Sequence, residues 1–228
     1  MKYIERTETP PFFNVDTADF KVWSDYNQNE TTKDNRRKLR SYILESEQKY
    51  LCGYCESKVS IENTHTDHKK PKGLPQYADL VFDFSNLIVS CEGNIHAELK
   101  KGDEDSETTC GHKKDNIFDE SLFLDPHVTE NISSYFSYNK ASGKITPSDD
   151  DIYSERNKKA TFMISLLQLN EGSLPRARLN AKKALLGRIQ GIKTGKVDQQ
   201  NFIKKVLDRK TNAFISYLDF CFASRLNK

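Results

Sequence analysis

Four of the five cysteines and four of the five histidines fall within residues 52–112. Cys52 and Cys55 form a C-x-x-C knuckle, in which two thiolates can bind one ion, and tetrahedral zinc needs two more soft ligands. Cys91 and Cys110 are the available candidates, separated by a polar insertion, residues 92–109, that we expect to be a loop. The set predicts a structural zinc site, although a lone C-x-x-C is also compatible with a redox pair or with two unrelated buried cysteines.

The pair Asp67-His68 lies between the two halves of this cysteine set, in the segment 65–68. In an extended chain alternate residues share a face, so His65 and Asp67 point to one side and His68 to the other. A carboxylate suits a hard divalent cation such as Mg²⁺, and a neutral imidazole can take a proton from water. The segment therefore predicts a strand that carries a metal ligand and a general base.

A second strand and a helix are expected to follow. The run 81–91 is apolar, with β-branched and aromatic residues typical of a strand, and it contains the polar Asn86. A helix is expected to begin at Cys110, and His112 and Asn116, four residues apart, would share one of its faces. A strand, a second strand and a helix that carry D-H, N and H in this order are typical of a metal-dependent nuclease.

As a set, these motifs resemble the HNH (ββα-metal) endonucleases with a zinc-ribbon brace. The phrases CGYCE, NLIVSC and CGHKKDN are more narrowly similar to the HNH subunit of Septu anti-phage systems, PtuB, which also occurs as a retron-associated effector. The motifs cover roughly a third of the chain, and the similarity extends along most of it. The resemblance implies an α+β, mainly helical fold, in which a small zinc-braced ββα-metal core lies between N-terminal and C-terminal helices.

The resemblance also implies the roles of the site residues. His68 would be the general base, Asp67 and His112 would hold a catalytic Mg²⁺ or Mn²⁺ ion, and Asn86 would orient His68 or brace the loop. Many zinc-braced HNH enzymes have a metal-binding asparagine directly after the last cysteine, where this chain has Gly111. In this chain His112, or Asn116 one turn later, would take that role.

Basic residues beside the expected catalytic strand and helix could contact phosphates, although such runs are usually solvated faces and the net charge is only +2. These residues are Lys69, Lys70, Lys72, Lys113 and Lys114. The chain has no phosphate-binding G-x-x-x-x-G-K-[ST] sequence. The resemblance assigns nucleotide hydrolysis to a separate PtuA-type ATPase partner, and it implies a reverse transcriptase with its RNA and DNA as further partners in a retron.

The chain carries neither the apolar region of a signal peptide nor a run of about 18 apolar residues, so we expect a cytoplasmic protein without a membrane partner. Thiols stay reduced in that compartment, which favours zinc over disulfides. Cys221, in an apolar helical stretch, and Trp23 are expected to be core residues. His127, which follows Pro126, is expected in a turn or at the surface.

Three segments are predicted: a helical arm, the zinc-braced HNH core, and a hairpin with a helical lobe, at residues 1–50, 51–125 and 126–228. In the arm, Pro10-Pro11 predicts an irregular start up to residue 15, followed by helices from residue 16 or 17 and over 32–50. The last segment predicts a hairpin over 132–145 and helices over 153–169, 173–190 and 198–226.

Three functions compete. The favoured one is an endonuclease that hydrolyses DNA or RNA, such as tRNA, as the effector of an anti-phage defence system. A non-catalytic zinc-ribbon adaptor for nucleic acid or protein would share the cysteines but gives no reason for Asp67-His68 beside Asn86 and His112. An enzyme that uses zinc directly, as deaminases do, needs an H-x-E motif where this chain has aspartate at position 67.

Overall fold

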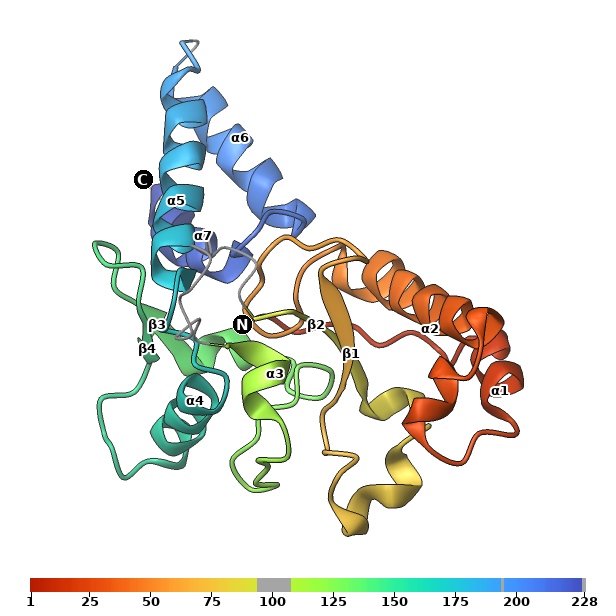
Figure 1. Ribbon diagram of the computed structural model, residues 1–228. Coiled ribbons are helices and arrows are strands. Elements are labelled where there is room, and N and C mark those ends of the chain that lie inside the picture. Colours follow the sequence, from red (N-terminus) through yellow and green to blue (C-terminus); the bar gives the residue numbers. More distant parts are fainter. Residues whose placement is uncertain (94–107, 194, 227–228) are drawn as a thin grey trace, which may run out of the picture.

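The computed structural model of the protein describes residues 1–93, 108–193 and 195–226. In this part of the chain helices predominate over two small two-stranded sheets, which confirms the α+β, mainly helical class (Figure 1). Most of the polar insertion, including His96, lies outside the described residues. No helix among the described residues is long and apolar enough to cross a membrane.

The N-terminal arm begins with a helix that was not expected. Helix α1 (Pro11–Thr17) starts at Pro11, where a missing backbone N–H has no cost, so the two prolines initiate a helix instead of blocking one. A 3₁₀ turn (Trp23–Asn27) follows, and then α2 (Glu30–Ile43), which continues as a π-helical turn (Leu44–Gln48). The predicted helix over 32–50 is confirmed, with an end at about residue 48.

The centre of the molecule is an antiparallel hairpin of β1 (Thr64–His68) and β2 (Leu87–Cys91), in the register Thr64 opposite Cys91 (Figure 1). The second strand is shorter than predicted, because a 3₁₀ turn at residues 84–86 precedes it. The side-chain amide of Gln48 donates to the carbonyl of Val89 and accepts from its N–H, both at 2.8 Å. Through Gln48, the arm therefore forms hydrogen bonds with backbone groups of β2 that the hairpin leaves unpaired.

Helix α3 (Cys110–Lys114) begins where the sequence predicts, but it spans only five residues. It ends because the next residue, Asp115, has a positive φ of 44°. Asn116 thus lies beyond the helix, and the expectation that it shares a helical face with His112 is wrong.

The described residues after α3 form the second hairpin and four α-helices. Their bounds are β3 (Phe136–Tyr138), β4 (Ile145–Pro147), α4 (Glu155–Leu166), α5 (Leu174–Gln190), α6 (Lys196–Arg209) and α7 (Ile215–Phe222). The hairpin and the first two helices agree with the prediction. The expected single helix over 198–226 is wrong, because Lys210 and Phe214 adopt left-handed backbone conformations and divide it into α6 and α7. Cys221 is buried in α7, as expected.

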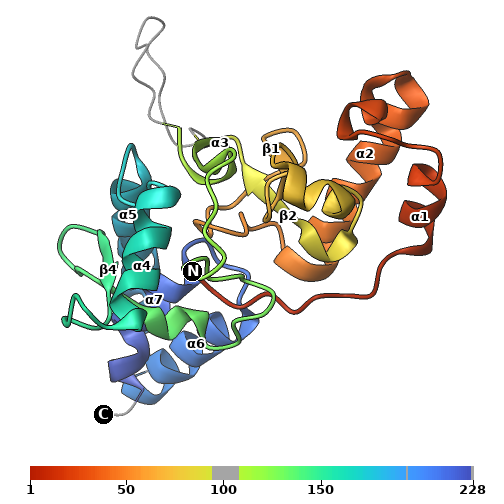
Figure 2. The ribbon, with the colours of Figure 1, turned by 90° about the horizontal axis from the view of Figure 1, so that it is seen from below.

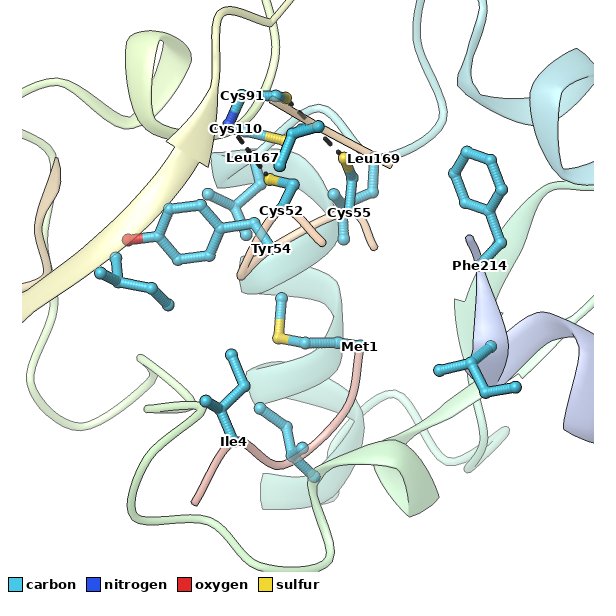
Figure 3. Packing of buried hydrophobic residues seen from close by; sticks show 14 of the residues in the cluster. Met1, Ile4, Cys52, Tyr54, Cys55, Cys91, Cys110, Leu167, Leu169 and Phe214 are labelled. Carbon is cyan, nitrogen blue, oxygen red and sulfur yellow. Dashed lines mark hydrogen bonds between the residues drawn. The ribbon is translucent and has the colours of Figure 1, made fainter. Parts of the chain in front are cut away.

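One hydrophobic core joins the arm, the central hairpin and the C-terminal helices. Its centre brings the knuckle cysteines beside residues from both ends of the chain, among them Ile4 and Phe214 (Figure 3). Backbone hydrogen bonds tie the same parts together: the Cys110 N–H donates to Leu167 at 2.9 Å, and the Phe214 N–H donates to Glu56 at 2.8 Å. In the second view, the irregular segment of residues 1–10 runs between the right-hand helices α1 and α2 and the C-terminal helices (Figure 2).

Candidate functional site

Four buried thiols form the first candidate metal centre. The sulfurs of Cys52, Cys55, Cys91 and Cys110 lie within 4.8 Å of one another, and none of these cysteines is in a disulfide (Figure 3). The Sγ atoms of Cys55 and Cys91 are 3.8 Å apart, which is about the spacing that bonds of about 2.3 Å to a tetrahedral ion produce. Burial alone would raise the pKa of Cys52, but hydrogen bonds from the other thiols outweigh it and hold that pKa well below its usual value. The cluster fits a structural metal ion.

The knuckle between Cys52 and Cys55 packs directly onto the central hairpin. The N–H of Gly53 donates to the carbonyl of Val89 at 3.0 Å, and a Cβ at this glycine would come within 2.4 Å of the Ile88 side chain. Next to it, the hydroxyl of Tyr54 donates to the carboxylate of Asp67 at 2.6 Å. The knuckle thus helps to fix the position of the Asp67 side chain.

Asp67 lies on the less buried face of β1, as the strand pattern predicts, with its side chain 12% exposed. Burial raises its pKa, and the nearby ammonium group of Lys114, 3.5 Å from the carboxylate, opposes that shift. Lys114 is itself fully buried and donates to the His68 carbonyl at 2.9 Å. Lys114 therefore braces β1 from inside, and the structure does not present it to a phosphate as predicted.

His68 points to the opposite face of β1 and is 2% exposed. Its ring meets Trp23 edge-on at 4.5 Å, so Trp23 is a core residue that also contacts the candidate site. Its Nε2 lies 2.9 Å from the carbonyl of Val81, and this acceptor requires the tautomer with a proton on Nε2. Its Nδ1 has no hydrogen-bond partner among the described residues. The free lone pair is thus on Nδ1, the form that a general base needs.

Asn86 lies at the end of the 3₁₀ turn before β2 and bonds only to backbone. Its side chain accepts from the Lys70 N–H at 2.8 Å and donates to the carbonyls of Lys70 and Leu80 at 3.0 and 3.1 Å. Of the two roles expected for it, these contacts favour bracing the loop that follows β1.

His68, Asp67 and His112 line one cavity of about 250 Å³ on the surface between β1 and α3. Its other lining residues are Trp23, Arg36, His65, Thr66, Pro71, Lys72, Gly111, Asp115 and Asn116. The cavity has room for a phosphate group and bound waters. Within the part of the chain that is described, it brings together the predicted general base, the predicted metal ligands and one predicted phosphate contact.

His112 has contacts that the sequence analysis did not anticipate. Its Nε2 donates to the carboxylate of Glu92 at 2.5 Å, and its ring lies 4.0 Å from the ring of His65, centroid to centroid. Glu92 had no predicted role, although its place directly after Cys91 was a usable signal. The register of the hairpin brings it close to His65, since Thr64 pairs with Cys91.

The five predicted phosphate contacts divide by burial. Lys72 and Lys113 are exposed, and Lys70 is partly buried and bonded to Glu120. Lys69 is 4% exposed, and its ammonium group bonds both carboxylate oxygens of Asp125 at 2.8 and 2.6 Å, so it is not available to a phosphate. The same buried cluster contains the last histidine.

His127 was expected in a turn or at the surface; it does lie in a turn, but it is buried there. It is 8% exposed, lies 3.1 Å from the Lys69 ammonium group, and reaches the carboxylate of Glu47 at 3.5 Å. Burial lowers the pKa of His127, because a charged imidazole at this position would have no access to water. It is a structural residue that connects the end of the arm to the chain after the central hairpin.

The pKa of His68 yields a prediction about stability. Burial lowers this pKa from 6.5 to about 4. Between pH 6.5 and 4 the imidazole binds a proton in the unfolded chain but not in the folded chain. The free energy of unfolding is therefore unaffected by this group above pH 6.5 and falls as the pH is lowered from 6.5 toward 4. We expect His68 to account for a loss of up to about 3 kcal/mol in the free energy of unfolding.

Urea unfolding of the zinc-loaded protein between pH 7.5 and 4.5 measures this loss, with His68→Phe as the reference. The variant has no imidazole at this position but undergoes the same titration of thiols and carboxylates. Its unfolding free energy should therefore fall less steeply below pH 6.5, and parallel curves would contradict the prediction.

No family model matches the chain. A protein of Vibrio cholerae serotype O1 biovar El Tor, provisionally named as the HNH endonuclease of retron Vc95, is 32% identical over 170 residues, which are 74% of this chain and 72% of that protein. An Escherichia coli protein, provisionally named as the HNH endonuclease of retron Ec83, is 27% identical over 62% of this chain and 63% of its own length. Because its sequence identity to the Vibrio cholerae protein is 32% over more than two thirds of both chains, this chain belongs to the family of retron HNH endonucleases.

Proposed function

We propose that the protein is a metal-dependent endonuclease that hydrolyses nucleic-acid phosphodiester bonds with His68 as the general base. The observation that carries this proposal is the state of the His68 ring. The Val81 carbonyl holds its Nε2 proton, its Nδ1 lone pair is free, and the imidazole lines the same cavity as Asp67 and His112. With a pKa of about 4, this histidine is neutral at pH 7 and able to accept a proton.

In the proposed reaction, His68 Nδ1 removes a proton from a water molecule as its oxygen attacks the phosphorus in line with the departing oxygen. Asp67 and His112 are the proposed ligands of a catalytic Mg²⁺ or Mn²⁺ ion, which would stabilise charge on the phosphate and on the leaving oxygen. Asn116 lines the cavity and stays a candidate additional ligand. Asn86 acts indirectly, by holding the loop after β1.

We further propose that β1, β2 and α3 form the ββα-metal unit of an HNH nuclease. Zinc bound by the four cysteines would brace it, and four thiolates leave no position for a reacting water. This favours a structural ion over direct zinc catalysis. We propose that residues 51–125 carry the chemistry and that residues 1–50 support it through Gln48 and Trp23. Residues 126–228 would form a hairpin and a helical lobe that share the same hydrophobic core.

The names of the two relatives support a place for this protein in a retron defence system. The proposed substrate is DNA or RNA, bound through its phosphates by Lys70, Lys72 and Lys113. Arg36, which lines the cavity, is a further cation for this purpose. Following the sequence resemblance to PtuB, we propose a PtuA-type ATPase partner and, in a retron, a reverse transcriptase with its RNA and DNA.

A cleavage assay tests the function. The zinc-loaded protein, alone and with a PtuA-type ATPase, is incubated with duplex DNA, single-stranded DNA and tRNA in Mg²⁺, Mn²⁺ or EDTA. We expect cleavage of at least one substrate that requires the added cation. Inertness towards all substrates in both states would favour the non-catalytic adaptor.

A further inference from the structure

Three potential metal ligands meet at the edge of the cavity, from three different elements. His65 comes from β1, Glu92 directly follows β2, and His112 comes from α3. One ligand atom of each lies within 4.8 Å of the other two. Among the described residues, this group and the four cysteines are the two sets of three or more such ligands that lie so close together.

The carboxylate of Glu92 faces both imidazoles, one with each oxygen. Its Oε2 accepts from His112 Nε2 at 2.5 Å, whereas its Oε1 lies 3.6 Å from His65 Nδ1, too far for a hydrogen bond. His65 Nδ1 is buried and has no hydrogen-bond partner among the described residues. Leaving a buried polar atom unpaired is unfavourable, so hydrogen bonding alone does not account for the position of His65.

We infer that His65, Glu92 and His112 together bind one divalent transition-metal ion, and that this is the cation of the proposed nuclease. Ligand bonds of about 2.0–2.2 Å place neighbouring donor atoms about 3–3.6 Å apart. The separation of His65 Nδ1 from Glu92 lies in this range, and the shorter contact of His112 with Glu92 is a hydrogen bond that the ion would replace. The inference rests on the proposed function for its catalytic role, but the binding site itself does not. The inferred site adds His65 and Glu92 to the proposed ligand His112. The other proposed ligand, Asp67, follows His65 by two residues on the same face of β1.

The donor set determines the class of ion. Mg²⁺ prefers oxygen ligands and retains several waters, whereas imidazole nitrogens favour first-row transition metals. A site with two imidazoles and one carboxylate should therefore prefer Mn²⁺ or a later transition metal to Mg²⁺.

Gly111 gives a separate reason why His65 can occupy this place. A Cβ at position 111 would stand 2.6 Å from His65 Nε2 and 3.0 Å from the Ser90 hydroxyl. The Gly111 N–H also donates to that hydroxyl at 3.0 Å, which holds the backbone close to β2. Any side chain at position 111 would thus displace the imidazole, and the glycine makes room for His65 as a ligand.

Mn²⁺ binding tests the inference without any measurement of cleavage. The zinc-loaded protein is titrated with Mn²⁺, and the free ion is followed by its electron paramagnetic resonance signal. We expect one bound Mn²⁺ per chain that a hundredfold excess of Mg²⁺ does not displace. Glu92→Gln and His65→Ala should each weaken binding by about tenfold or more. Gly111→Ala should weaken it in the same direction by moving the imidazole.

Glu62→Gln is the matched control, because it removes an exposed carboxylate that pairs with Arg37, and it should leave Mn²⁺ affinity unchanged. Glu92 is itself 38% exposed, so its variant should fold, which the zinc content and circular dichroism verify. Unchanged Mn²⁺ affinity in both Glu92→Gln and His65→Ala, or no Mn²⁺ binding by the wild type, would overturn the inference. Mn²⁺ binding that depends on these residues in a protein that cleaves nothing would uphold the site and refute the nuclease proposal.

Discussion

Replacement of His68 by alanine should lower the rate of cleavage by about 10²- to 10⁴-fold, the usual contribution of a positioned general base. The other two histidines that line the cavity face Glu92: His112 Nε2 donates to its carboxylate, and His65 Nδ1 lies 3.6 Å from it. Single-turnover cleavage at saturating cation concentration measures this loss. The zinc content should stay near one ion per chain, since no sulfur ligand is touched.

The control for this prediction is His127→Gln, which also alters a buried histidine but lies in the cluster of Lys69 and Glu47. This variant should lower the midpoint of thermal unfolding and keep the cleavage rate at temperatures where it is folded. Cleavage by His68→Ala within about threefold of the wild-type rate would eliminate the proposed mechanism, since loss of a general base cannot have so small an effect.

Replacement of Cys110 by serine should prevent the central hairpin and α3 from folding together. Structural zinc contributes about 10–16 kcal/mol in small zinc-dependent domains, whereas whole domains are stable by only about 5–15 kcal/mol. A change that weakens the metal site strongly can therefore exceed the stability of the fold. Zinc content, circular dichroism and resistance to proteolysis should all be lost, and a strong chelator should have the same effect on the wild type.

Cys221→Ala is the matched control, because Cys221 is also a buried thiol but lies in α7, outside the four-cysteine cluster. It should keep one zinc ion and a cooperative unfolding transition. A Cys110→Ser protein with full zinc content and wild-type thermal stability would show that the four thiols do not act as one metal site.

Local patterns predicted the parts of the fold that depend on neighbouring residues. The alternation over 65–68 predicted β1 and its two faces, the apolar run ending at Cys91 predicted β2, and the cysteine spacing indicated the cluster that the structure shows. The failures lie where distant contacts decide. Nothing local distinguishes Lys69, Lys114 and His127 from surface residues, because each is buried by acidic or carbonyl partners that are remote in sequence.

Two further misses have the same kind of cause. The break between α6 and α7 depends on left-handed conformations at Lys210 and Phe214, neither of which is a glycine, so the continuous apolar pattern concealed it. Glu92 follows Cys91 directly, yet its proximity to His65 follows only from the strand register, and its contact with His112 spans an insertion. The sequence therefore predicted roles for Asp67 and His68 but none for Glu92.

Glu56, the residue after the knuckle, forms hydrogen bonds with residues about 160 positions further along the sequence, which are synthesised much later. Its carbonyl accepts from Phe214, and its carboxylate accepts from the N–H and hydroxyl of Ser216 at 2.8 and 2.5 Å. A nascent chain interrupted before these positions would lack the contacts that seat the knuckle. We therefore expect prematurely terminated products to lack a correctly folded knuckle, and with it the proposed nuclease activity.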